Sequence, residues 1–94
     1  MATFFLFGRY SPEALRGISA ERTEKVVELI EGMGGKVEAI YALLGERDLV
    51  LIVDLPGLQE AFKASVALGK LTGISFSTSA ALKVEDFDRL ATSV

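Results

Sequence analysis

A short polar turn that runs directly into the most apolar segment constrains the fold of this chain more than any other feature. The turn is Gly45 to Asp48, and the segment that follows it is Leu49 to Leu55. A glycine-opened turn between two apolar runs predicts a β-hairpin. The second run carries apolar residues on both of its faces, which is typical of a central strand. We therefore expect the rest of the chain to pack around this hairpin.

The N-terminal segment predicts another strand of the same kind, from Thr3 to Tyr10. It is rich in aromatic residues and ends before a Ser-Pro pair, which is typical of a strand that runs into a turn. Alternation places Phe4 and Leu6 on one face, and Phe5 and Phe7 on the other. Because both faces are apolar, we expect this strand to be buried on both sides.

Two longer helices are predicted, because apolar residues recur at a spacing of three or four positions. The first runs from a cap at Ser19 to Gly34, and the second follows Pro56-Gly57. Their apolar stripes, in chain order, are Val26, Val27, Ile30 and Met33, and then Leu58, Ala61, Phe62, Ser65, Val66 and Gly69. We expect both stripes to pack on a sheet. Ser11 is expected to cap a short helical turn, and the segment from Val84 to Leu90 predicts a last one.

Two further strands are predicted over residues 36–44 and 74–82, where apolar residues alternate with other residues. Alternation in the first places four side chains on one face, namely Val37, Ala39, Tyr41 and Leu43. Alternation in the second gathers a row of hydroxyls on one face, namely Ser75, Ser77 and Ser79.

The order strand, helix, strand, strand, helix, strand predicts one α+β domain over residues 1–94 with a ferredoxin-like βαββαβ fold. Such a sandwich has a four-stranded antiparallel sheet with two helices on one face. The helices are expected to cover the more apolar face of the hairpin strand, which carries Leu49, Leu51, Val53 and Leu55. The opposite face would leave Val50 and Ile52 uncovered. Monomers rarely expose large apolar patches, so we expect a homodimer or higher homo-oligomer that pairs through this open face.

Composition excludes several classes of function. The net charge is −3 and the calculated pI is near 4.9, without a basic stripe, which argues against a nucleic-acid partner. The chain has no cysteine and no histidine, so we expect no disulfide, no metal and no cofactor. The apolar N-terminus lacks a basic leader and is too short to span a membrane. These features predict a cytoplasmic protein with no membrane association.

Three motifs carry a resemblance to a known family. They are Tyr10-Ser11-Pro12-Glu13, Gly34-Gly35-Lys36-Val37 and the turn Gly45-Glu46-Arg47-Asp48 with the apolar run after it. Together with the predicted fold, they make the chain similar to the GYD-domain family of small bacterial and archaeal proteins, within the dimeric α+β barrel superfamily. Family members carry a tyrosine where this chain has Arg47. The resemblance implies a dimeric α+β barrel and no particular reaction, because the family is functionally uncharacterised.

Five residues are candidates for binding a ligand. Arg47 suits bidentate pairing with a carboxylate, although an arginine on an exposed turn is more often solvated. Asp48 could act as a base, although an aspartate after a turn glycine is more often structural. Tyr10 and Tyr41 could donate hydrogen bonds into an enclosed space or serve in packing. Ser77 belongs to the serine row, which has no histidine beside it to activate a hydroxyl.

Three functions stay open on this reasoning. The first is a small-ligand-binding or structural oligomeric module. The second is a cofactor-independent enzyme, similar to the monooxygenases and isomerases of the superfamily, that acts on a small hydrophobic substrate in the barrel cavity. The third is a regulatory module similar to the effector-binding domains of Lrp/AsnC regulators, which share a related hairpin motif.

Overall fold

The structure is a computed structural model that describes residues 1–94. Its elements follow the predicted order, including the helical segment expected from Val84. They are β1 (Ala2–Arg9), α1 (Pro12–Arg16), α2 (Ala20–Gly32), β2 (Lys36–Ala42), β3 (Leu49–Leu55), α3 (Leu58–Thr72), β4 (Ser75–Ala81) and α4 (Val84–Thr92).

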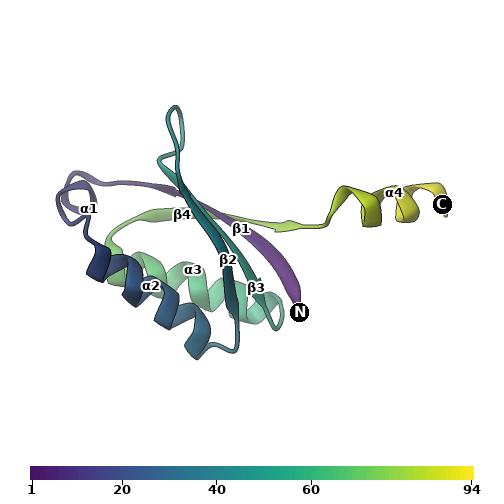
Figure 1. The fold of residues 1–94 in the computed structure, drawn as a ribbon, viewed down its shortest axis with the longest axis horizontal. Coiled ribbons are helices and arrows are strands. Elements are labelled where there is room, and N and C mark those ends of the chain that lie inside the picture. The colour runs from purple at the N-terminus through teal and green to yellow at the C-terminus, as the bar shows by residue number, and fades with distance from the viewer.

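The sheet has four strands in the order β2-β3-β1-β4, and every neighbouring pair is antiparallel. The two central strands are therefore β1 and β3, the two segments that the sequence marks as apolar on both faces. Helices α2 and α3 lie side by side against one face of this sheet (Figure 1). This arrangement confirms the predicted ferredoxin-like α+β fold.

The ends of the helices are fixed by the residues that the sequence predicts. The Ser11 hydroxyl accepts a hydrogen bond from the backbone N–H of Ala14 at 3.0 Å. The Ser19 hydroxyl accepts from the N–H of Arg22 at the same distance. Gly34, which follows α2, has a φ of +79°, a conformation that is costly for residues with a Cβ atom.

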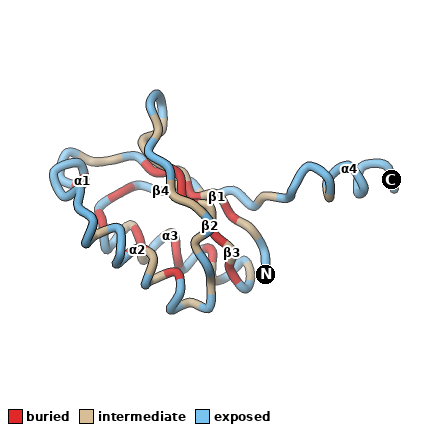
Figure 2. The backbone as a smooth tube through the Cα atoms, viewed as in Figure 1, coloured by how far each residue is buried: buried red, intermediate tan, exposed pale blue.

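The hydrophobic core lies between the sheet and these helices. Side chains of β1 and β3 that point toward the helices are fully or nearly fully buried, and Figure 2 shows the buried segments concentrated in this layer. The core cluster consists of Phe4, Leu6, Val26, Ile30, Leu51, Val53, Leu55, Ala61, Ala64 and Leu68. The helices therefore cover the predicted face of the hairpin strand.

The prediction of which α3 residues pack on the sheet is wrong in part. The residues that α3 buries are Ala61, Ala64, Leu68 and Thr72. Leu58, Phe62 and Val66, which we expected to pack on the sheet, are exposed. Two small alanines let the helix approach the sheet closely, and this contact rotates the larger apolar residues away from the core.

The alternation predicted for residues 36–44 is also interrupted, between Val37 and Ala39, and Val37 therefore does not share a face with the residues predicted beside it. A β-bulge between Val37 and Ala39 interrupts the pairing of β2 with β3. Val37 pairs with Val53 and Ile40 pairs with Leu51, so both of them lie on the helix-covered face, whereas Ala39 pairs with Ile52 on the open face. An extra residue at a bulge moves every following side chain to the other face of the strand.

Helix α4 extends away from the body of the domain (Figure 1). None of its residues is buried. The radius of gyration is 14.1 Å, against about 12 Å for a compact chain of this length, and the difference reflects this extension. No helix in the structure is long and apolar enough to cross a membrane.

Candidate functional site

The face of the sheet opposite the helices carries an aromatic and aliphatic centre. The side chains of Phe5 and Phe7 alternate with the buried side chains of β1, and their ring centroids are 6.2 Å apart. Register places Ile52 beside Phe5 and Val50 beside Phe7 on β3. The Val50 side chain is buried although no helix covers it, which shows how closely its neighbours surround it.

Asp48 connects the hairpin to the end of β1. Its Oδ2 accepts a hydrogen bond from the backbone N–H of Tyr10 at 2.8 Å, and its own N–H donates to the carbonyl oxygen of Gly8 at 2.9 Å. Its carbonyl oxygen accepts from the N–H of Leu43 at 2.8 Å. The first two bonds hold the turn against the end of β1 and occupy one carboxylate oxygen of Asp48, and the third closes the hairpin.

The two arginines next to this connection lie at one end of the open face. The Arg47 guanidinium lies over the ring of Phe7, at 5.6 Å from its centroid. The Arg9 Nε donates to the carbonyl oxygen of Glu46 at 3.1 Å. Both contacts fix the position of a guanidinium and leave its terminal nitrogens without a hydrogen-bond partner in the chain.

Both arginines line one hollow of about 220 Å³ together with two hydroxyls of the serine row. Its lining residues are Arg9, Glu46, Arg47, Ser75, Phe76 and Ser77. Arg9 pairs with Ser75 across the ladder between β1 and β4, and Phe7 pairs with Ser77. We call this hollow the arginine hollow. Its charged lining is two arginines and one glutamate, beside two hydroxyls, so the net charge is positive and suited to an anion.

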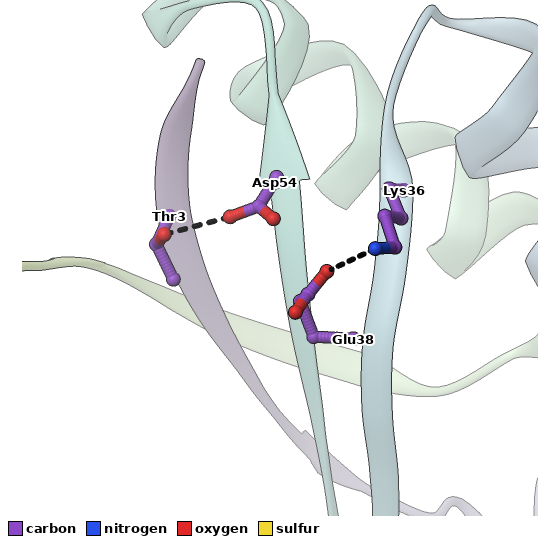
Figure 3. A network of polar contacts seen from close by, with 4 residues as sticks. All are labelled: Thr3, Lys36, Glu38 and Asp54. Atoms are coloured by element: carbon purple, nitrogen blue, oxygen red, sulfur yellow. Dashed lines mark hydrogen bonds and ion pairs between the residues drawn. The ribbon is translucent and has the colours of Figure 1, made fainter.

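The opposite end of the open face carries charges of both signs. The Thr3 hydroxyl donates to Asp54 Oδ1 at 2.7 Å, and Lys36 forms an ion pair with Glu38 at 3.2 Å (Figure 3). A hollow of about 390 Å³ lies beside these residues, and Lys83 also lines it. The open face is therefore polar at both ends and apolar in the middle.

The predicted site residues do not form a single cluster. Arg47 and Ser77 meet in the arginine hollow. The backbone of Tyr10 is bonded to Asp48, but its ring contacts the Arg22 guanidinium at 5.8 Å, on the side of α2. Tyr41 pairs with Val50 on the open face, and its side chain is exposed.

Arg9 is the residue of the arginine hollow that sequence reasoning did not select. It is the last residue of β1, and its neighbours Ser75 and Ser77 come from a strand more than sixty positions away. The available signal was an arginine at the end of an aromatic strand, in alternation with Phe5 and Phe7. No group of three or more acidic side chains gathers in the structure to hold a metal ion.

Comparison with known proteins gives one family and one solved structure. The family model described as GYD domain matches residues 4–91. No curated protein matches the sequence. The fold is similar to the crystal structure of the Mycobacterium tuberculosis leucine response regulatory protein (LrpA), with a TM-score of 0.58 and 12% sequence identity. The match covers 87% of this chain and 51% of that one, so the chain spans about half the length of that regulator. At this identity the likeness shows the fold alone.

Proposed function

We propose that this chain, which belongs to the GYD domain family, is a small-ligand-binding module that holds a carboxylate in the arginine hollow. The observation that supports the proposal is the presence of Arg9 and Arg47 beside two serine hydroxyls, next to the apolar centre of the open sheet face. A guanidinium presents parallel N–H groups whose geometry matches the two oxygens of a carboxylate.

The contacts of the two arginines prepare them for an anion. Cation–π contact with Phe7 holds Arg47 in place, and the carbonyl oxygen of Glu46 uses only the Nε of Arg9. The terminal nitrogens of both side chains stay available as donors. Ser75 and Ser77 supply hydroxyls that donate to the same anion. Less side-chain entropy is then lost on binding, because two of the groups are already positioned.

The neighbouring part of the face indicates the rest of the ligand. Phe5, Phe7 and Ile52 form the apolar centre of the open face next to the hollow. A ligand with a carboxylate at one end and an aliphatic or aromatic group at the other would contact both. The structural neighbour is titled a leucine response regulatory protein, and leucine is a small carboxylate with an apolar side chain. This likeness supports an effector-binding role.

A second copy of the chain would enclose the ligand. The open face carries half-buried aromatic and aliphatic residues, and a face of this kind is ordinarily covered in solution. Two-fold pairing of two such faces would exclude water from the apolar centre and from the hollow. Exclusion of water strengthens the attraction between a guanidinium and a carboxylate.

Titration with L-leucine, phenylacetate and leucinamide tests this function. We expect the two carboxylates to bind and leucinamide, which lacks a carboxylate, to bind at least tenfold more weakly. Loss of a charge-assisted hydrogen bond is worth about 1.5–3 kcal/mol, so Arg47→Gln and Arg9→Gln should each raise the dissociation constant about 10- to 100-fold. The measurement is isothermal titration calorimetry.

Arg16→Gln is the matched control, because Arg16 is an exposed arginine on α1 that does not line the hollow. It should leave the dissociation constant unchanged. Equal binding of leucine and leucinamide, or equal losses in all three variants, would contradict a carboxylate site. Absence of binding by both carboxylates at millimolar concentration would contradict it as well.

A further inference from the structure

Helix α4 has an apolar face that nothing in the chain covers. Val84, Phe87 and Leu90 recur at intervals of three residues, and Ala91 and Val94 extend the same stripe. The Phe87 side chain is 56% exposed. A nine-residue helix is marginal in water without packing of its apolar face. This helix therefore requires a surface to cover it.

A surface of matching kind lies on the outer side of α3. Leu58, Phe62 and Val66 recur at intervals of four residues and are exposed, with Phe62 at 69%. Beside them is an apolar hollow of about 280 Å³ between α3 and β4, to which Phe4, Phe62 and Phe76 contribute their rings. We call the row and the hollow together the α3 groove. An amphipathic helix that lies in such a groove is a recurring mode of recognition.

The charges beside the two surfaces are complementary. Asp88 of α4 lies at the edge of the apolar stripe and forms no ion pair within the chain. On α3, Lys63 and Lys70 lie one helical turn before and after Val66, at the margin of the groove. Opposite charges at the margin of an apolar contact favour one partner and one orientation. The acidic surface of α2, with four glutamates, would repel α4.

The polar side of α4 also argues against a lipid surface as the partner. Helices that lie in the plane of a membrane carry lysine and arginine on their polar side and are attracted to anionic lipids. Here the polar side carries Glu85, Asp86 and Asp88, and Arg89 is paired with Asp86. A protein groove with lysines at its margin fits this helix better.

The backbone between β4 and α4 directs the helix away from the groove of its own chain. Only Leu82 and Lys83 separate the two elements. Lys83 is extended, with φ −63° and ψ 143°, so the chain continues past the end of the sheet (Figure 1). Because the helix leads outward, the groove that it meets belongs to another molecule.

We infer that residues 84–94 form an arm that docks into the α3 groove of a second copy of this chain. The inference does not depend on carboxylate binding, because neither arginine lines the groove and Phe76 is the one residue that the groove shares with the arginine hollow. Exchange of arms between two copies would be two-fold symmetric and would cover both apolar surfaces at once. Phe87 is the residue at the centre of the apolar stripe and is expected to contact the ring of Phe62.

Disulfide trapping tests this contact, and the chain suits it because it contains no cysteine. Phe62→Cys and Phe87→Cys are made in separate chains, one of them labelled with ¹⁵N, then mixed and oxidised. We expect the mixed 62–87 disulfide to exceed either same-site dimer at least fivefold by mass spectrometry. Leu15→Cys is the control for Phe62→Cys, because Leu15 is exposed but lies on α1. If Leu15→Cys forms as much mixed disulfide with Phe87→Cys as Phe62→Cys does, the inference is overturned.

Three further results separate an arm exchanged between molecules from the alternatives. A chain that carries both cysteines should form disulfides between molecules, and an intrachain disulfide would mean that the arm folds back on its own groove. Phe87→Ser should weaken self-association at least tenfold in sedimentation equilibrium and leave the urea midpoint of the dilute domain unchanged, because Phe87 is not buried in the chain. Unchanged self-association would overturn the inference. Trapping that persists in Ile52→Asp would show that the arm contact is independent of pairing through the open face.

Discussion

The two faces of the sheet differ most clearly at two consecutive residues, Leu51 and Ile52. The Leu51 side chain is completely enclosed between the sheet and the helices, whereas the Ile52 side chain lies on the open face and is half-buried. Both residues belong to β3, and both are aliphatic. The comparison teaches that one strand can stabilise the fold with one face and remain available for a ligand or a partner with the other.

The largest difference in the free energy of unfolding is expected between variants that truncate the side chains of Leu51 and Ile52. Leu51→Ala should lower the free energy of unfolding by about 3 kcal/mol, because it removes buried methyl groups and leaves a cavity. Ile52→Ala should lower it by less than about 1 kcal/mol, because its side chain is partly solvated in the single chain. Urea denaturation at low protein concentration measures both. Similar losses for the two variants would remove the distinction between the faces.

A smaller loss in the free energy of unfolding is expected when a methyl group is added at Gly8, where the helix-covered face of the sheet is tightly packed. A Cβ atom at Gly8 would lie 2.3 Å from Leu49 Cδ2 and 2.9 Å from Ile74 Cγ2. Gly8→Ala should therefore destabilise the protein by about 1–3 kcal/mol, because two side chains must shift. Ser79→Ala, on the open face of β4, should change the free energy of unfolding by less than about 0.5 kcal/mol. An unchanged melting temperature for Gly8→Ala would show that this face tolerates added volume.

A clear change in assembly, with only a small change in the free energy of unfolding, is expected for Ile52→Asp. Its carboxylate can stay solvated in a single chain, so the free energy of unfolding should fall by no more than about 1 kcal/mol. The same carboxylate would be unpaired in an interface between two open faces, which is costly. Size-exclusion chromatography with light scattering should show a smaller species than the wild type. A wild-type elution volume would contradict pairing through this face.

The sequence was sufficient to predict the order of the helices and strands and the face of β3 that the helices cover. Alternation in β3 predicted that Leu51 faces the helices and Ile52 does not, and the burial of the two side chains confirms it. For β1 alternation separated Phe4 from Phe5 without predicting which of them is covered, and the structure buries Phe4. Cap residues are local signals, so the helix starts were also predicted. Gly45, expected to open the hairpin turn, has a φ of +118° there.

The features that could not be predicted depend on pairing between distant segments. The rotation of α3 follows from how closely Ala61 and Ala64 approach the sheet, which no helical periodicity specifies. The bulge in β2 is defined only by its partner strand. The arginine hollow combines the end of β1 with the hairpin and β4, so Arg9 gained its neighbours only when the strands were paired.

The bulge in β2 has a further consequence, for the solubility of the protein. Because β2 is an edge strand, its free N–H and C=O groups could pair with the edges of other copies without limit. The bulge interrupts the regular spacing of these groups, and Lys36 and Glu38 add charges beside it. Half of all residues are hydrophobic, a composition that would otherwise favour fibres. The irregular residue thus makes the β2 edge a poorer template for strand pairing than β4, the other edge strand, whose register is uninterrupted.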